Sequence, residues 1–327
     1  MLSNELSHGV SAVIPVFNAQ QSLPLLIQRL VPVLQSVAAS FEILLIDDGS
    51  TDDSWGVISS LAAAYDSIRG VRLMRNYGQH GALLCGIRLV RFDRTITLDD
   101  DLQNPPEEIP KLLSKLTPGV DVVYGTPQTA AHGLFRNLSS QITKVVLQKG
   151  MGAETARNVS AFRLFRTQLR EAFETYRAPY VSIDVLLTWA TARFTSVRVE
   201  HAPRSLGSSN YSLGKLLVHA LNMLTGFTTI PLQLASLVGI VFTCFGFLVL
   251  CFVLTRYFLQ GTTAPGFPFL ASVIAIFSGA QLFSLGIVGE YIARIHLRSM
   301  DRPSYTVLDS VQHGEYIERT SGNQRFE

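Results

Sequence analysis

Three consecutive aspartates, Asp99, Asp100 and Asp101, have the clearest capacity for chemistry in this sequence. They end a segment that opens with the apolar run TITL, which is typical of a buried strand. Because adjacent carboxylates repel one another, a cluster of three at a strand end indicates a positively charged ligand. Side chains alternate along an extended segment, which predicts that Asp99, Asp101 and Gln103 converge while Asp100 faces elsewhere. Two carboxylates and an amide oxygen suit Mg²⁺ or Mn²⁺ rather than zinc, and such an ion usually completes its shell with phosphate oxygens.

A second interpretation of this segment is an acidic helix start. Pro105, Pro106, Glu107 and Glu108 follow the aspartates and have the features of a helix N-terminus. That interpretation accounts for the two glutamates, but it leaves the three upstream aspartates unexplained.

The segment LLIDDGSTDDS is another acidic candidate site. Asp47 and Asp48 end a predicted strand and are followed by a turn at Gly49 and Ser50. An aspartate at such a strand end accepts hydrogen bonds from a base or a ribose in other nucleotide-binding folds. The same residue types also form common turns, so this segment alone leaves both interpretations open. The segment VIPVFN, at the end of the first predicted strand, would line the same edge of the sheet.

The elements that must position these residues alternate between strands and helices. Apolar runs predict strands over residues 10–16, 41–47, 70–76, 94–100 and 121–125, and helical periodicity predicts helices over residues 23–37, 51–65, 81–90 and 105–116. This alternation predicts an α/β fold with a mostly parallel sheet that is covered on both faces. Ligands of such sheets bind beyond the carboxyl ends of the strands, where the aspartates are expected.

The composition and the last third of the chain indicate a membrane protein. Charged residues make up 16% of the chain and the mean hydropathy is +0.27, which is too apolar for a purely soluble enzyme. Residues 232–254 carry no charge and would span about 34 Å as a helix, more than the ~30 Å of a hydrocarbon core. A second uncharged run covers residues 264–289, with the span itself beginning near Phe267 or Phe269. Buried core helices are the alternative, but two such runs favour membrane spans.

The distribution of lysine and arginine predicts the orientation of these spans. Arg204 and Lys215 precede the first span and further arginines follow the second, whereas the intervening loop holds one arginine. By the positive-inside rule, both termini are cytoplasmic in a multi-pass protein of the inner membrane. The apolar face of residues 213–225 predicts a helix that lies in the membrane interface, with a helix packed on the preceding domain as the alternative.

The remaining composition argues against several classes. A net charge of +2 does not indicate a nucleic-acid binder. The cysteines, Cys85, Cys244 and Cys251, lack the number and spacing of a disulfide framework or a zinc site. No signal-peptide pattern precedes the first predicted strand, so we expect the first part of the chain to fold in the cytoplasm.

Four motifs together carry a family resemblance. VIPVFN, LLIDDGSTDDS, RNYGQHGALLCGI and LDDDLQNPPEEIP, in this order and spacing, resemble the family-2 inverting glycosyltransferases of the GT-A fold. The closer similarity is to the branch that transfers sugars to polyprenyl phosphates, and with GEYIARIHLR it covers nearly the whole chain. Together with the change in composition near Tyr211, the resemblance predicts a cytoplasmic GT-A domain over residues 1–211, a juxtamembrane interfacial helix over 212–230, two transmembrane helices over 231–290 and a cytoplasmic tail over 291–327.

The resemblance also implies an activity and its partners. The activity would be inverting transfer of a sugar from a nucleotide-sugar, with UDP favoured, to polyprenyl (undecaprenyl) phosphate. The implied cofactor is Mg²⁺ or Mn²⁺. The implied assembly is a homo-oligomer, which in relatives is often a tetramer.

Candidate site residues follow from the same resemblance. The residues that would hold the nucleotide-sugar are Pro15, Phe17, Asp47, Asp48 and Asp99. The residues that would hold the metal are Asp99, Asp101 and Gln103. Arg136 and Ser140 match positions that bind the acceptor phosphate, a task for which a planar guanidinium is suited, although a solvated helix face is the alternative. Arg204 matches a basic residue near the leaving diphosphate, so the candidate catalytic residues are Asp99, Asp101, Arg136 and Arg204.

The chain departs from the family pattern at several positions. Ala19 stands where the family commonly has glutamate, Arg157 and Asn158 stand where it usually has an aspartate, and Asn210 replaces a lysine. These departures leave a non-catalytic interpretation open, and a second alternative exists within the same fold. One is a processive polysaccharide synthase, although two spans are few for a translocating channel and the Q-x-x-R-W motif is absent from the sequence. The other is a non-catalytic membrane scaffold or flippase subunit that keeps the fold.

Overall fold

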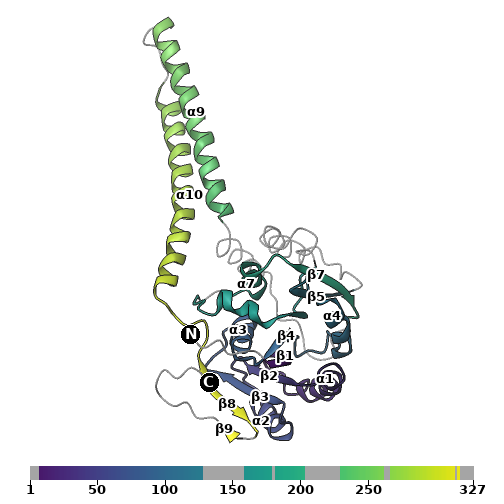
Figure 1. Ribbon diagram of the computed structural model, residues 1–327. Coiled ribbons are helices and arrows are strands. Elements are labelled where there is room, and N and C mark those ends of the chain that lie inside the picture. Colours follow the sequence, from purple (N-terminus) through teal and green to yellow (C-terminus); the bar gives the residue numbers. More distant parts are fainter. Residues whose placement is uncertain are drawn as a thin grey trace. The chain divides into compact units, whose positions relative to one another are not determined.

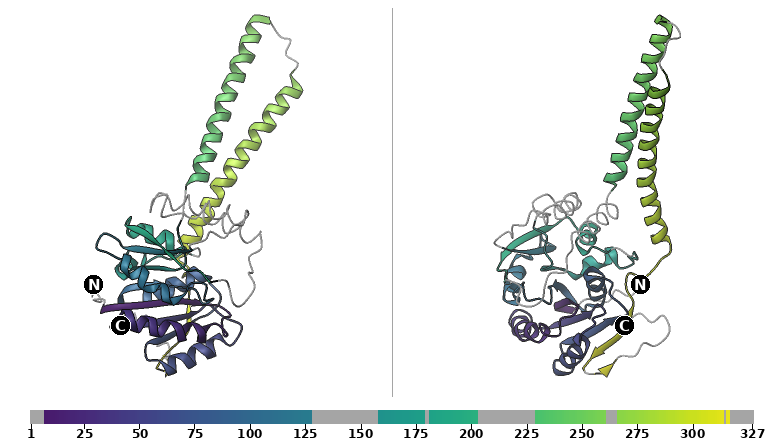
Figure 2. Two further views of the ribbon diagram at one scale, coloured as in Figure 1. Left: turned by 90° about the vertical axis from the view of Figure 1, so that its right-hand side faces the viewer. Right: turned by 180° about the vertical axis from the view of Figure 1, so that it is seen from behind.

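The computed structural model of the chain describes residues 7–127, 158–178, 181–202, 229–260, 266–313 and 315–316. The chain forms two units, one of Met1–Leu213 with Arg302–Glu327 and one of Gly214–Asp301. Figures 1 and 2 show a sheet with flanking helices in the first unit and two long helices in the second. The interfacial helix predicted over residues 213–225 lies outside the described residues.

The first unit consists of strands that alternate with helices. Its strands are β1 (Ser7–Val16), β2 (Phe41–Asp47), β3 (Ile68–Leu73), β4 (Phe92–Thr97), β5 (Val122–Pro127), β6 (Arg163–Arg166), β7 (Phe194–Val199), β8 (Val307–Gln312) and β9 (Glu315–Tyr316). Its helices are α1 (Leu23–Val37), α2 (Ser54–Ala64), α3 (Gln79–Leu89), α4 (Ile109–Lys115) and α7 (Ile183–Ala190), with 3₁₀ segments η1 (Pro106–Glu108) and η2 (Thr167–Phe173). Every strand and helix predicted for this unit up to residue 125 is present, with boundaries that differ by a few residues.

The strands form one nine-stranded sheet in the order β7-β5-β6-β4-β1-β2-β3-β8-β9. β1 pairs in parallel with β2 and β4, β2 with β3, and β5 with β7, whereas β6 and β8 run antiparallel to their neighbours. The prediction of a mostly parallel α/β sheet is confirmed. Because β1 to β4 are parallel, their carboxyl ends lie along one side of the sheet, which is called the carboxyl edge below. Sheets of this kind bind ligands there.

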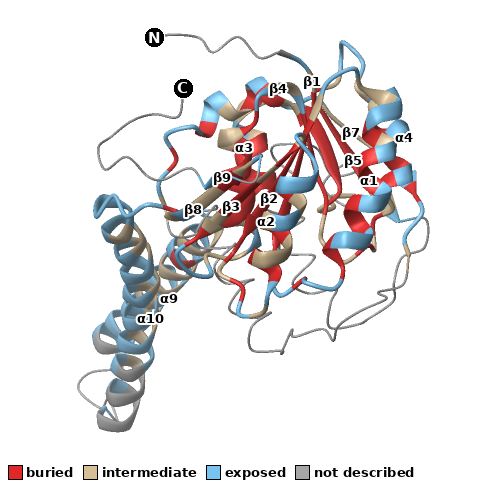
Figure 3. Cartoon of the chain, turned by 90° about the horizontal axis from the view of Figure 1, so that it is seen from below, coloured by how far each residue is buried: buried red, intermediate tan, exposed pale blue. Residues whose placement is uncertain are grey.

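Alternate residues of the central strands face two helical layers. Val10, Ala12 and Ile14 of β1 belong to a hydrophobic cluster shared with α1, α2 and α4. Val13, which lies between them in sequence, faces α3 on the other side of the sheet, where a Cβ at Gly86 would overlap Val13 Cγ1. Figure 3 shows the buried strands between these layers. Because α3 follows β3 in the chain, its first residues lie at the carboxyl edge. The close packing at Gly86 holds the helix against the sheet.

The structure corrects the expected conformation of the three aspartates. β4 ends at Thr97, so the three aspartates lie beyond the strand, with Asp100 and Asp101 in a turn and Asp99 directly before it. This segment, Asp99 to Gln103, is called the aspartate turn below. Leu102 adopts a positive φ of 60°, which changes the chain direction directly after the aspartates. The extended conformation assumed for these residues is therefore not observed. The convergence of Asp99, Asp101 and Gln103 stays a prediction.

The segment after the second long helix contributes to the sheet. β8 runs antiparallel to β3, with Val311 opposite Gly70, and Val311 is buried. The hydroxyl of Ser304 donates to the carbonyl oxygen of Ala178 at 3.0 Å, which fixes the approach to β8. Residues 291–327, expected as a tail, therefore include a strand of the main sheet, which the short sequence VLDSVQ, half of it polar, did not indicate.

The second unit contains two helices that are long and apolar enough, by length and composition, to cross a membrane. α9 covers Ile230–Gln260 and α10 covers Phe267–Ser299, and their candidate spans have mean hydropathies of 2.8 and 1.3. Neither span is buried within the structure, which argues against core helices. The rings of Phe242 and Phe277 join the helices edge to face, with their centroids 5.9 Å apart.

Candidate functional site

The loops after β1, β2, β3 and β4 meet at the carboxyl edge of the sheet, where hydrogen bonds join them. Phe17, directly after β1, donates its N–H to Asp100 Oδ2 at 3.2 Å. Gln79, after β3, donates its side-chain amide to Asp99 Oδ1 at 2.5 Å. The aspartate turn after β4 is therefore attached to two other loops of the same edge.

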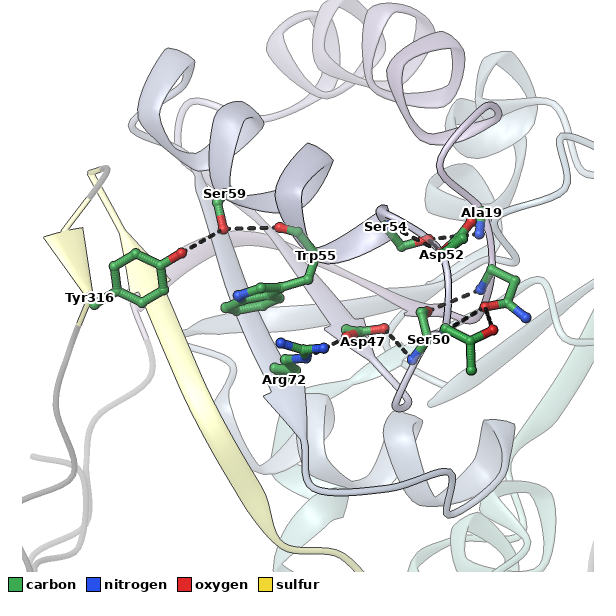
Figure 4. Close-up of polar contacts among 11 residues, drawn as sticks. Ala19, Asp47, Ser50, Asp52, Ser54, Trp55, Ser59, Arg72 and Tyr316 are labelled. Carbon is green, nitrogen blue, oxygen red and sulfur yellow. Dashed lines mark hydrogen bonds and ion pairs between the residues drawn. The ribbon is translucent and has the colours of Figure 1, made fainter.

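The loops after β1 and β2 are joined by a separate set of contacts. Asn18 donates its N–H to Ser50 Oγ at 3.0 Å, and Ala19 donates its N–H to Ser54 Oγ at 2.8 Å. The Ser54 hydroxyl in turn donates to Asp52 Oδ1 at 2.5 Å, as Figure 4 shows. These bonds hold residues 50–53 in a turn, so α2 begins at Ser54 and not at residue 51 as predicted.

Asp47, predicted to contact the nucleotide, is fully buried at the end of β2. Its Oδ1 accepts the N–H of Ser50 at 3.0 Å, and its Oδ2 lies 3.3 Å from Arg72 Nε, as Figure 4 also shows. The contacts described for Asp47 are thus with its own turn and with β3. A nucleotide contact by Asp47 stays a prediction.

Asp48 joins the loop after β2 to the loop after β3. Its two carboxylate oxygens accept the N–H groups of Tyr77 and Gly78 at 2.7 and 2.8 Å. Burial raises the pKa of Asp48 to about 6, although these two hydrogen bonds favour the charged form. Gly49 makes the close approach of the loops feasible, because its φ is +69° and a Cβ there would lie 2.7 Å from the carbonyl carbon of Arg75.

The raised pKa of Asp48 predicts a pH-dependent stability. This carboxyl titrates near 3.8 when unfolded and near 6 when folded, so the fold favours its protonated form. Its stabilising contribution is present below about pH 4 and is lost as the pH rises through about 6, by about 3 kcal/mol for about two pKa units. Asp48→Asn abolishes this titration. The unfolding free energy of Asp48→Asn minus that of the wild type should therefore rise by about 3 kcal/mol as the pH increases from about 4 to 8. Melting curves across this range measure the difference, and parallel profiles would contradict the prediction.

The aspartate turn concentrates negative charge. Asp101 Oδ1 accepts the N–H of Gln103 at 3.2 Å, a partner different from those of Asp99 and Asp100. Burial raises the pKa of Asp100 to about 7, and repulsion from Asp99 and Asp101 adds to the effect. The carboxylates are thus close enough to repel one another, as their order in the sequence indicated.

The oxygen donors of this turn fit a hard divalent cation. Asp99, Asp101 and Gln103 offer carboxylate and amide oxygens, which Mg²⁺ and Mn²⁺ prefer. Within the described ranges, no group of three or more His, Cys, Asp and Glu side chains forms a metal site. Two carboxylates leave most of an octahedral shell to other oxygens, such as those of a diphosphate. The arrangement therefore suits a cation that binds together with an anionic ligand.

Of the other predicted site residues, the structure describes Pro15 and Phe17 but not the three that are expected to bind phosphate groups. Pro15 is buried within β1, whereas Phe17, just beyond the strand, is 46% exposed at the same edge. Arg136, Ser140 and Arg204 lie outside the described residues. The structure thus brings Phe17 to the aspartate turn, and acceptor binding by Arg136 and Ser140 stays a prediction.

Sequence reasoning gave no role to Gln79, although the structure places its amide on Asp99. The available signal was the pair Gly78-Gln79 after the third strand, where a glycine with a φ of 84° precedes the first residue of α3. Secondary-structure propensity cannot show that the Gln79 side chain reaches the aspartate turn after β4.

Comparison with known proteins places the chain among glycosyltransferases. The family model described as glycosyl transferase family 2 matches residues 11–176. The chain is 38% identical to the undecaprenyl-phosphate 4-deoxy-4-formamido-L-arabinose transferase of Yersinia enterocolitica, over 100% of both chains, and 38% identical over the same shares to the protein of that name from Yersinia pestis.

A solved structure supports the fold. Glucosyl-3-phosphoglycerate synthase from Mycobacterium tuberculosis, in complex with Mn²⁺, UDP-glucose and phosphoglyceric acid, matches with a TM-score of 0.52 and 18% identity, over 67% of this chain and 78% of that one. At this identity the likeness shows the fold alone, which is the expected GT-A fold. The family model covers the segment that contains the four motifs. The chain is a glycosyltransferase and belongs to glycosyl transferase family 2.

Proposed function

We propose that this glycosyltransferase moves a sugar from a nucleoside diphosphate, with UDP favoured, to polyprenyl (undecaprenyl) phosphate. The observation that carries the proposal is the 38% identity, over the whole of both chains, to undecaprenyl-phosphate 4-deoxy-4-formamido-L-arabinose transferases. The product would be a polyprenyl-phosphate sugar used in lipid A modification or another envelope glycan.

The aspartate turn is the proposed site of the donor diphosphate. Asp99, Asp101 and Gln103 would hold Mg²⁺ or Mn²⁺ there, and the bound ion would neutralise charge that develops on the leaving diphosphate. Phe17 and Asp48 come from neighbouring loops of the same edge and would line the nucleotide side, with Pro15 and Asp47 behind them. The solved structural neighbour was crystallised with Mn²⁺ and UDP-glucose, which agrees with a divalent cation at such a site.

The acceptor requires positioning more than activation. A phosphate monoester has a second pKa of about 6, so most of it is already dianionic at neutral pH. Its oxygen would attack the anomeric carbon opposite the diphosphate, and the bond to the diphosphate would break as the new bond forms, which inverts that carbon. Arg136 and Ser140 would hold the acceptor phosphate, and Arg204 the leaving group. The N–H of Ala202, near Arg204 in sequence, donates to the carbonyl oxygen of Gln103 at 2.9 Å, which supports this placement.

The two long helices suit a lipid acceptor. α9 and α10 would cross the inner membrane with both termini in the cytoplasm, as the arginine distribution predicts. Anchoring the enzyme in the bilayer that holds the polyprenyl tail raises the local concentration of the acceptor phosphate. A homo-oligomer, with a tetramer as the expected form, stays a prediction that size determination in detergent would test.

A donor screen tests the proposed reaction. The purified chain is incubated with undecaprenyl phosphate, Mg²⁺ or Mn²⁺ and a panel of UDP-sugars, and the extracted lipid is analysed by mass spectrometry. A lipid-linked monosaccharide that disappears with EDTA supports the proposal. A growing polymer would instead support a processive synthase. Metal-dependent donor binding without transfer from any donor would support a non-catalytic role.

The variant Arg136→Ala tests the acceptor site. Removing a charge-assisted hydrogen bond to the phosphate should raise the KM for undecaprenyl phosphate by about 10-fold or more, with little change in the KM for the nucleotide-sugar. Arg94→Ala is the matched control, because Arg94 is an exposed arginine of β4. A selective rise in the donor KM would overturn the assignment of Arg136.

A further inference from the structure

We propose that Gln79 is a positioning residue of the transfer site, which orients the carboxylate of Asp99 toward the metal–diphosphate. The inference rests on the proposed function and extends it to a residue that neither the motifs nor the comparisons assign. Its basis is the hydrogen bond of 2.5 Å between Gln79 Nε2 and Asp99 Oδ1.

A hydrogen bond from the Gln79 amide can orient the Asp99 carboxylate, but it does not neutralise the charge of that group. An amide donor engages one carboxylate oxygen and restricts rotation of the group, but it leaves the negative charge in place. Lysine or arginine at this position would compete with a cation for the same charge. Hydrogen bonds from residues outside the metal shell commonly fix ligand orientation and set metal affinity in this way.

The chain around Gln79 directs its side chain to Asp99. Asp48 accepts the N–H groups of Tyr77 and Gly78, which fixes the loop immediately before α3. Gly78 then turns the chain with a φ of 84°, and Gln79 is the first residue of the helix. Asp48 and the aspartate turn are thereby connected through Gln79.

A role in folding alone does not explain this contact well. Gln79 is exposed, and a hydrogen bond of an exposed side chain adds little to stability because water offers the same bonds in the unfolded chain. The bond also does not cap α3, because its acceptor lies in the turn after β4. We therefore expect substitutions of Gln79 to change the site while leaving the fold intact.

Mn²⁺ binding tests the inference without relying on turnover. The full-length protein is purified in detergent, and free Mn²⁺ is measured by EPR in the presence of saturating UDP. Gln79→Met keeps the length of the side chain without the donor, and Gln79→Asn keeps the amide one methylene shorter. We expect both variants to bind Mn²⁺ about 10- to 100-fold more weakly than the wild type. The kcat of transfer should also fall, while the KM for undecaprenyl phosphate and the melting temperature stay unchanged.

Gln35→Met is the matched control, because Gln35 is an exposed glutamine of α1. Unchanged Mn²⁺ affinity in both Gln79 variants, with normal binding by the wild type, would overturn this inference alone. So would a loss that is matched by a lower melting temperature in both variants, since that pattern belongs to a structural role. A wild type that binds no Mn²⁺ would instead overturn the metal requirement of the proposed function, and the role of Gln79 with it.

Discussion

Replacing Asp101 by asparagine is expected to reduce sugar transfer by about 10³-fold or more while the protein stays folded and in the membrane. The substitution removes one negative charge from the turn that would bind the cation beside the leaving diphosphate. Folding should be preserved because the asparagine carbonyl can still accept the N–H of Gln103, which is 3.2 Å from Asp101 Oδ1. Transfer of labelled sugar into extractable lipid measures the loss, and EPR of Mn²⁺ measures the accompanying loss of metal binding.

Asp93→Asn provides a matched control for this prediction. Asp93 lies on the same strand, β4, but near its opposite end, where it accepts hydrogen bonds from His8 and from the N–H of Gly9 at 3.1 and 2.9 Å. The control should transfer sugar at nearly the wild-type rate. Near-normal activity of Asp101→Asn itself would remove the metal role of that residue.

Asp184→Ala is expected to lower the free energy of unfolding by about 3–5 kcal/mol. Asp184 Oδ1 accepts hydrogen bonds from Arg163 Nη1 at 2.5 Å and from the hydroxyl of Tyr124 at 3.0 Å. The Arg163 side chain is only 2% exposed, so alanine at position 184 would leave a buried guanidinium without its described counter-charge. Burial, with Asp184 adding to the effect, raises the pKa of Tyr124, which therefore remains a protonated donor.

The double variant Arg163→Met with Asp184→Leu removes both charges of the buried pair and keeps the site filled. Replacing both charges by apolar side chains of similar size should recover part of the stability lost by Asp184→Ala, because no buried charge remains uncompensated. The buried hydroxyl of Tyr124 still loses its described acceptor, which limits the recovery. Chemical denaturation in detergent measures all three proteins. A loss below about 1 kcal/mol in Asp184→Ala would show that the ion pair contributes no more than an exposed one.

Local patterns in the sequence were sufficient for the strands and helices up to residue 125, for the two long apolar helices and for the family. The alternation of apolar strands and amphipathic helices predicted the parallel core, because each such element must bury one face against its neighbours. Uncharged runs predicted α9 and α10, since length and composition alone make a helix compatible with a bilayer. The aspartate turn was located because like charges placed side by side are costly without a ligand.

The tertiary structure was needed for the contacts between individual residues of different loops. Gln79 and Asp99, Asp48 and Gly78, and Phe17 and Asp100 are separated by 20, 30 and 83 positions, and no local propensity encodes such contacts. The same holds for β8, whose short and half-polar sequence forms a strand beside β3, which supplies its hydrogen bonds. Periodicity reports which face of an element is apolar. The direction of a side chain in a turn depends on backbone angles and distant partners, and these exist only once the chain has folded.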